Sequence, residues 1–316
     1  MKLYVGITDY DWFTFHSSKP TVEEVNFWRP STQPYRKDFY PGMPFLFKLH
    51  APNNYIVGGG FFLKFLPLPL SLAWRAFCEG NGARSLEEFR TMIGNYRSLS
   101  PTEDSQIGCT ILGEPFFLDE SDWIPSEPYL QGPIVSGKGN FDSGTALKLW
   151  MEVTKRLDAK AIRTTTIVPG PATEAALETA RFGTPILVAP RLGQGSFRAL
   201  VTSVYDYRCA ISSERTLPVL QAAHIRPYAE GGQHELSNGP LLRSDLHTLF
   251  DQHYITIEPT KKTIIVSRRI REQYKNGRDY YALKDQPLAH PSDILAEPSN
   301  ESLIYHFERF RELESS

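Results

Sequence analysis

The segment at residues 222–251 constrains the fold of this chain most strongly. It reads AAHIRPYAEGGQHELSNGPLLRSDLHTLFD and holds three of the eight histidines, His224, His234 and His247. The apolar run VLQAAHI that ends near His224 predicts a short strand, and the EGG after it indicates a loop. LLRSDLHTLFD (241–251) has the apolar spacing of a helix, and the alternation in YITIEPTKKTIIVS (254–267) after it predicts a β-hairpin. A further short strand is predicted at 208–211. The predicted order is therefore strand with His224, loop with Asn238, and helix with His247.

This ordered set of residues resembles the HNH endonuclease family, which carries them on a ββα-metal finger. The matching stretches are AAHIRPYAEGG, SNGPLL and LHTLFD, and the upstream RLGQGSFRALVTSVYDYRCAIS is similar to the lead-in of restriction-type members. Asn238 lies 14 residues after His224, and His247 lies 9 residues after Asn238, which is normal for that family. The resemblance covers about residues 191–258 and implies a metal-dependent nuclease.

Each residue type suits a step of phosphodiester hydrolysis. A water must lose a proton near neutral pH, and the ordinary histidine pKa of ~6.5 fits that task, so His224 is the expected general base. His247 is the expected metal ligand, and Asp251 follows at i+4, on the same face of the predicted helix. The resemblance implies that Asn238 supports the loop and holds His224 in position.

The residue before His224 departs from the family pattern. Many HNH enzymes carry an Asp or His metal ligand there, whereas this chain has Ala223. The ion would then be held by His247, Asp251, waters and substrate phosphate, or His224 would itself be a ligand. Such sparse protein coordination favours Mg²⁺ or Mn²⁺, with Zn²⁺ or Ni²⁺ as the alternative. His253 is an alternative ligand.

A basic segment indicates contact with DNA. Residues 261–278, KKTIIVSRRIREQYKNGR, hold seven lysines and arginines against one acid, although the whole chain has a net charge of −2. Phosphate contacts supply most non-specific affinity for DNA. A solvated surface is the alternative interpretation. The expected DNA-binding residues are Arg191, Arg226, Lys261, Lys262, Arg268, Arg269 and Arg271.

The first 160 residues are expected to form short strands and a few helices. Strands are predicted at 2–8, 44–50, 55–65 and 107–118, and helices at 69–77, 85–99 and 144–157. This pattern, with its Trp-rich opening, is similar to the PUA-like superfamily, which includes EVE and related modified-base recognition domains. Its members often hold a flipped-out base between aromatic rings. The candidates here are Trp28, Trp12, Trp123 and Phe39, unless these aromatics form the core of a small barrel. His234, in the polar stretch GGQHEL, is interpreted as a solvated loop residue.

The predicted fold class is α+β with two domains. A PUA-like small β-barrel with helices is expected over residues 1–160, a connector rich in Thr, Pro and Ala over 161–190, and a ββα-metal HNH nuclease domain over 191–316. The isolated cysteines have no CxxC pair, which favours a reducing, cytoplasmic compartment. The start MKLYVGITDYDWF lacks the order of a secretion signal, and Lys64, Pro67 and Pro69 interrupt the most apolar stretch. No membrane association is expected.

The sequence predicts a metal-dependent HNH endonuclease, and more specifically a modification-dependent restriction enzyme that cuts foreign double-stranded DNA. Two alternatives stay open. One is a DNA-binding protein whose HNH fold has lost the ability to cleave DNA, as Ala223 in place of the usual metal ligand would indicate. The other is an HNH nuclease whose first domain binds a protein partner. Double-strand cutting by a single-site nuclease favours a homodimer, or two molecules that meet on the DNA.

Overall fold

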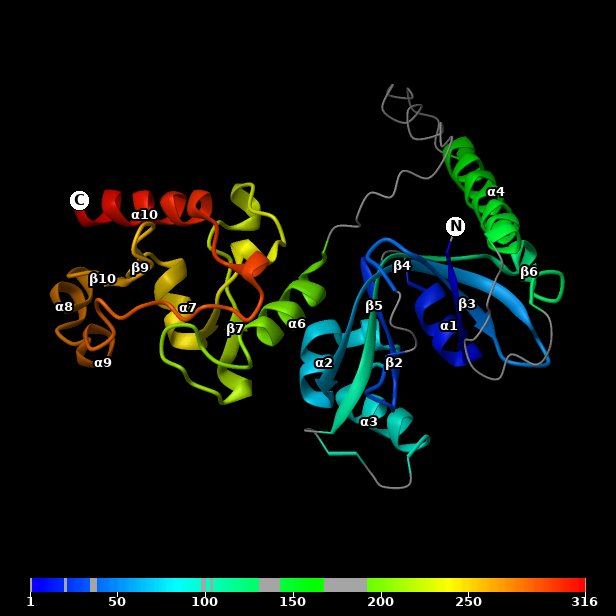
Figure 1. Ribbon diagram of the computed structural model, residues 1–316, viewed down its shortest axis with the longest axis horizontal. Coiled ribbons are helices and arrows are strands. Elements are labelled where there is room, and N and C mark those ends of the chain that lie inside the picture. Colours follow the sequence, from blue (N-terminus) through cyan, green and yellow to red (C-terminus); the bar gives the residue numbers. More distant parts are fainter. Residues whose placement is uncertain are drawn as a thin grey trace. The chain divides into compact units, whose positions relative to one another are not determined.

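The computed structural model divides the chain into two compact units, Met1–Arg191 and Leu192–Ser316, here called the N-terminal unit and the C-terminal unit. It describes residues 2–19, 22–34, 39–97, 101–102, 105–130, 143–167 and 192–315, without the side chains of 143 and 160–167. Both units combine helices with strands, so the chain is α+β as the sequence predicted (Figure 1).

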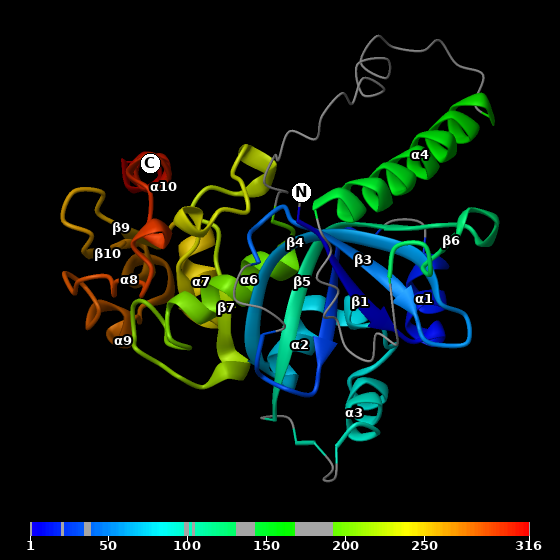
Figure 2. The ribbon, with the colours of Figure 1, turned by 45° about the vertical axis from the view of Figure 1, so that its right-hand side comes forward.

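The N-terminal unit is built on a six-stranded sheet that curls into a half-barrel (Figure 2). Its strands run in the order β1-β3-β4-β5-β2, and β6 pairs with β4. Only β1 and β3 are parallel; the other pairs are antiparallel. The bounds are β1 Tyr4–Thr8, β2 Glu24–Arg29, β3 Pro44–Leu49, β4 Tyr55–Pro69, β5 Gln106–Phe117 and β6 Ile124–Pro125.

Bulges and glycines explain how the long strand β4 bends. Its register against β5 shifts between Gly59 and Phe61 and again between Phe62 and Lys64. Extra residues of this kind bend a strand and increase its twist. A Cβ at Gly58 would lie 2.3 Å from the Phe116 carbonyl oxygen, so the backbones approach too closely there for any other residue.

Helix α1, Tyr10–Ser17, packs against the sheet and supplies aromatic residues to its core. The Trp12 ring meets the Phe27 and Phe47 rings edge to face, at 5.4 and 5.1 Å between centroids. Neither α1 nor β2 was predicted from the sequence. The aromatic residues crowded in DWFTF of α1 and NFWR of β2 obscure the apolar periodicity by which a helix or a strand is predicted.

The other helices of this unit are α2 Leu70–Phe77, α3 Leu86–Gly94 and α4 Ser143–Ile167. Ser85 caps α3 through a hydrogen bond from the Glu88 amide to its hydroxyl oxygen (3.1 Å). The Glu88 carboxylate accepts from the Arg84 amide at 2.7 Å, one residue earlier than in a standard capping box. α4 extends into the predicted connector, of which residues 168–190 lie outside the described part of the chain.

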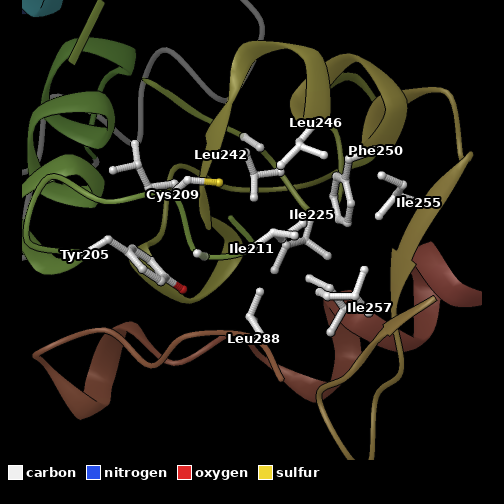
Figure 3. Packing of buried hydrophobic residues seen from close by; sticks show 14 of the residues in the cluster. Tyr205, Cys209, Ile211, Ile225, Leu242, Leu246, Phe250, Ile255, Ile257 and Leu288 are labelled. Carbon is white, nitrogen blue, oxygen red and sulfur yellow. The ribbon is translucent and has the colours of Figure 1, made fainter. Parts of the chain in front are cut away.

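The C-terminal unit is a set of short elements around one core. They are α6 Gln194–Val204, β7 Leu220–Ala222, β8 Leu241–Arg243, α7 Ser244–Asp251, β9 Ile255–Ile257, β10 Ile264–Val266, α8 Arg269–Tyr274, α9 Arg278–Tyr281 and α10 Asn300–Ser315. β7 pairs with β8, and β9 with β10, both antiparallel, so the predicted hairpin at 254–267 is confirmed. Side chains from distant segments, such as Ile225, Phe250 and Leu288, meet in the core (Figure 3).

Two local predictions in this unit were wrong. Residues 208–211 were expected to be a strand, but they form a turn in which the Ser213 amide donates to the Cys209 carbonyl oxygen at 3.0 Å. Residues 241–251 were expected to be one helix, but the first three form β8 because Leu241 and Leu242 pair with β7. The helix α7 begins at Ser244. Among the described residues, no helix has the length and apolar content needed to cross a membrane.

Candidate functional site

The pairing of β7 with β8 brings the predicted catalytic residues into one region of the C-terminal unit. His224 follows β7, Asn238 lies in a short helical turn before β8, and His247 and Asp251 lie on α7. Leu220 of β7 pairs with Arg243, the residue before α7. The first turns of α7 therefore lie beside β7, and the His247 Nδ1 reaches the Gln221 Oε1 at 2.7 Å.

Asn238 closes the loop between the strand and the helix. Its buried amide accepts from the Arg226 backbone amide at 2.9 Å, and donates to the carbonyl oxygens of Arg226 and Gln233 at 3.0 Å each. The same chain segment turns at Gly231, whose φ of +87° is in the left-handed region that favours glycine. One side chain therefore fixes backbone two residues after His224 and one residue before His234.

The His224 ring is held on two sides. It stacks on the Phe197 ring of α6 at 4.2 Å between centroids and 17° between planes. Its Nε2 hydrogen-bonds to the His234 Nδ1 at 2.9 Å. Within the part of the chain that the structure describes, no group hydrogen-bonds to its Nδ1. Burial, followed by the nearby His234 and His247, lowers the pKa of His224 to about 4, so the imidazole is neutral at neutral pH.

His234 is half-buried, and the interpretation of it as a solvated loop residue was wrong. Besides its bond to His224, it stacks on the Tyr228 ring at 4.8 Å and 11°. These contacts could not be predicted from the sequence, because the direction of a loop side chain depends on how the loop is closed. The only available signal was a second histidine within the same motif.

His247 and Asp251 converge as the i+4 spacing predicted. The His247 Nε2 lies 3.3 Å from the Asp251 Oδ2. Gln221 accepts at the opposite ring nitrogen, so in the neutral imidazole Nε2 carries the lone pair. Burial raises the pKa of Asp251, whereas His247 and His253 lower it. An imidazole nitrogen and a carboxylate oxygen at this separation fit two ligands of one divalent cation.

In the described residues, no group of three or more His, Cys, Asp or Glu side chains lies close enough to hold a metal ion. Ala223 is completely buried in the core and supplies no ligand atom. The alternative ligand His253 packs instead against His306, with 4.5 Å between ring centroids, and its carbonyl oxygen accepts from Arg269.

Several of the predicted DNA-binding residues have partners within the C-terminal unit. Lys262 pairs with Glu297 at 2.8 Å, and Arg269 pairs with Glu314 at 3.5 Å. The Arg226 guanidinium donates to the Glu230 carbonyl oxygen and lies over a tyrosine ring. Of the remainder, Arg268 also pairs with Glu314, Arg271 lies over Tyr281, Lys261 is exposed, and Arg191 lies outside the described residues. The charge of this surface is thus partly balanced, and its role in DNA contact stays a prediction.

The N-terminal unit contains a separate cavity of about 190 Å³. Asp9 is one of its polar lining residues; it accepts a hydrogen bond from the Tyr96 hydroxyl at 2.6 Å and lies 3.3 Å from the His50 Nε2. The half-buried Trp28 lines the cavity, and its Nε1 donates to the Asn81 carbonyl oxygen at 3.0 Å. The lining residues are Ile7, Thr8, Asp9, Trp12, Phe27, Trp28, Arg29, Pro30, His50, Met92 and Tyr96.

The other aromatic candidates serve mainly as core. Trp12 reaches the cavity but is 5% exposed, and it packs edge to face with Phe27 and Phe47. Phe39 packs on the same core, and Trp123 packs between α1 and β4 with its Nε1 bonded to the Leu118 carbonyl oxygen. Trp123 and Phe39 do not line the cavity. Trp28 is therefore the candidate that combines a cavity position with partial exposure.

Comparison with known proteins agrees with the geometry of the C-terminal unit. The model of the HNH endonuclease family matches residues 209–258, a span that includes His224, Asn238, His247 and Asp251. No curated protein matches the chain. The match points to nuclease activity in this part of the chain, and HNH nucleases act on DNA with a divalent metal.

Proposed function

We propose that this chain is a modification-dependent restriction endonuclease: the C-terminal unit cuts foreign double-stranded DNA, and the N-terminal unit recognises a base. The observation that carries the proposal is the environment of His224. A neutral imidazole with one nitrogen hydrogen-bonded and the other open is a histidine prepared to accept a proton. The HNH match over the same residues supports the assignment.

In the proposed reaction, His224 Nδ1 takes a proton from the water that attacks the scissile phosphorus. Burial keeps the imidazole neutral before the substrate arrives. The negative phosphate then favours the protonated form, because an opposite charge nearby raises the pKa of a histidine. Asn238 holds the backbone beyond His224 and so keeps the base in place while the proton moves.

His247 and Asp251 would hold the divalent cation, with Mg²⁺ or Mn²⁺ favoured over Zn²⁺ or Ni²⁺. Two protein ligands leave room for waters and substrate oxygens, as Mg²⁺ requires. Gln221 orients the His247 ring so that Nε2 carries the lone pair. When bound, the cation supplies positive charge that stabilises the scissile phosphate and the departing 3′ oxygen.

The N-terminal cavity supports the proposed base recognition by a PUA-like domain. Its volume of about 190 Å³ lies below the ~300–1,000 Å³ of typical small-molecule pockets, which suits one flat ring better than a large ligand. Trp28 and Tyr96 supply aromatic surface for such a ring. The Asp9 carboxylate is an acceptor, so the cavity favours a flipped-out base with an exocyclic amino group, of the cytosine or adenine type.

Two other functions remain candidates. A DNA-binding protein with an inactive HNH fold would explain Ala223, but the convergence of His247 with Asp251 and the open Nδ1 of His224 favour an enzyme. A protein-binding N-terminal unit is less favoured, because protein binding does not account for a cavity lined by a carboxylate and aromatic rings. For double-strand cutting we propose a homodimer, or two molecules that act from opposite strands.

A plasmid assay tests the proposal directly. Supercoiled DNA carrying methylated or hydroxymethylated cytosine, methylated adenine, or no modification is incubated with the full chain and Mg²⁺, Mn²⁺, Zn²⁺, Ni²⁺ or chelator. We expect metal-dependent nicking or linearisation that is faster on one modified form. His224→Ala is the matched control. Binding of DNA without cleavage under every condition would favour the inactive HNH fold. Equal cleavage of all substrates would favour a protein-binding role for the N-terminal unit.

A further inference from the structure

We propose that His234 is a positioning residue for the hydrolysis: its Nδ1 accepts the Nε2–H of His224 and so fixes the tautomer in which the His224 Nδ1 is the base. The inference rests on the proposed nuclease function and assigns a role to a residue outside the three that define the motif.

The geometry restricts the His224 ring in two independent ways. The Phe197 ring, stacked at 17°, fixes the plane of the imidazole. The bond of 2.9 Å from Nε2 to the His234 Nδ1 fixes its rotation within that plane, because it holds one ring nitrogen at one point. Neither contact alone would hold the Nδ1 in one direction.

His234 is itself held firmly enough to serve this purpose. The Tyr228 ring covers its face at 4.8 Å and 11°. The carbonyl oxygen of the preceding residue, Gln233, accepts from the Asn238 amide at 3.0 Å. The side chain that fixes the backbone after His224 therefore also fixes the backbone before His234, and the two histidines are set as a pair.

The chemistry of a neutral imidazole gives the bond its consequence. One ring nitrogen carries a hydrogen and the other a lone pair. If the His234 Nδ1 accepts, the hydrogen of His224 is on Nε2 and the lone pair is on Nδ1, where a water can be deprotonated. If His234 donated instead, the hydrogen of His224 would be on Nδ1 and the base would be lost. A histidine base in the wrong tautomer is a known cause of large losses in rate.

Two substitutions of His234 separate this role from simple packing. His234→Leu fills the space but removes the acceptor, whereas His234→Asn places an amide oxygen close to the position of Nδ1. In the full chain with Mg²⁺ or Mn²⁺, we expect His234→Leu to lower kcat for plasmid cleavage about 10–100-fold, as loss of a partner that orients a functional histidine does. KM and the melting temperature should change little, and His234→Asn should recover most of the rate.

A second pair of variants acts through Tyr228. Tyr228→Leu removes the ring that covers His234 and should lower kcat in the same direction but less, whereas Tyr228→Phe keeps the ring and should cleave like the parent. Equal rates for Leu and Asn at position 234, or parent-like cleavage by His234→Leu, would overturn the inference.

Nitrogen NMR of the full chain labelled at histidine reads the tautomer without any cleavage. We expect the His224 signals, assigned by comparison with His224→Asn, to show the hydrogen on Nε2 in the parent and in His234→Asn. In His234→Leu they should show a mixture. A hydrogen on Nδ1 in the parent overturns the inference. An inactive parent with the expected tautomer would reject the proposed function and leave the His224–His234 bond intact.

Discussion

The two candidate sites of this molecule are assembled over very different distances along the chain. The site in the C-terminal unit draws His224, His234 and His247 from one short segment, and hydrogen bonds within residues 221–251, together with the Phe197 ring, set its geometry. The cavity in the N-terminal unit draws Asp9 and Tyr96 from segments 87 residues apart, and the curled sheet sets its geometry. A local site leaves a pattern in the sequence, whereas a site made by the fold does not.

The two sites also differ in how their side chains are connected. In the C-terminal unit, polar side chains are joined to one another and to backbone, and a single change would leave a partner unsatisfied. In the N-terminal unit, Asp9 is joined to Tyr96 and His50, while the rings of Trp28 and Tyr96 supply aromatic surface to the cavity, so a change of Trp28 alters mainly that surface. We therefore expect changes in the first site to act on rate and changes in the second to act on preference.

The largest effect is expected from His224→Ala. Loss of a general base typically costs ~10²–10⁴ in rate, while the affinity for DNA should stay close to that of the parent because no phosphate contact is removed. Single-turnover nicking and gel-shift titration measure the two quantities. His50→Ala in the N-terminal cavity is the comparison variant, and it should alter substrate preference without slowing cleavage of the preferred DNA to this extent. Parent-like cleavage by His224→Ala would mean that another residue is the base.

Substitutions around the proposed cation should follow. His247→Ala and Asp251→Ala should lower metal affinity and cleavage together, with partial recovery in excess Mn²⁺. Gln221→Leu should cost about 10–100-fold, because it removes the partner that orients His247. Metal titrations of the cleavage rate test this. If Asp251→Ala left the metal dependence unchanged, the second protein ligand would lie elsewhere, with His253 the next residue to substitute.

Trp28→Ala should act on discrimination alone. Base–aromatic stacking is worth ~1–3 kcal/mol per base, so the preference for modified over unmodified DNA should fall by that amount. Cleavage of unmodified DNA should be unchanged. Competition binding with matched duplexes measures the preference, and Trp123→Phe, outside the cavity, is the control. A preference that survives Trp28→Ala would place base recognition away from this cavity.

The smallest effect is expected in the pH dependence of the free energy of unfolding. Burial lowers the pKa of His306 to about 3, ahead of the charge of His253, and that of His224 to about 4, both in the C-terminal unit. Because these folded-state values lie below the unfolded value of ~6.5, their stabilising contribution is complete above pH 6.5 and is lost as the pH falls towards 4. Each histidine contributes at most ~1.4 kcal/mol per pH unit, and less where it is partly exposed.

Urea unfolding of the full chain between pH 7.5 and 4.5 checks this. The N-terminal unit has one histidine of this kind, His16, whose pKa is lowered to about 3 mainly by burial. All five tryptophans lie in the N-terminal unit, so their fluorescence follows that unit, whereas far-ultraviolet circular dichroism follows both units. We expect the C-terminal unit to lose stability more steeply as the pH falls. Equal slopes for the two units would contradict the comparison.

The sequence was informative where a side chain's position follows from its own neighbours. The order strand, loop and helix around His224, Asn238 and His247 was predicted, as was the hairpin after it. Gln221 was not singled out, because its contact with His247 exists only once β7 pairs with β8. Trp12 and Trp28 were both candidates in the sequence, and only the folded structure shows that Trp12 is buried and Trp28 partly exposed.

The amide of Asn238 has a consequence for how this loop can change in length. Because this one side chain hydrogen-bonds to the backbone of both Arg226 and Gln233, the residues between them form a loop whose two ends are fixed. Residues inserted after Ala229, at the exposed tip, would add only a small closure cost, since that cost grows slowly with loop length. The loop between them is thus a place where a tag, or an added DNA-contacting segment, can be accommodated, provided that the Tyr228 ring keeps its contact with His234.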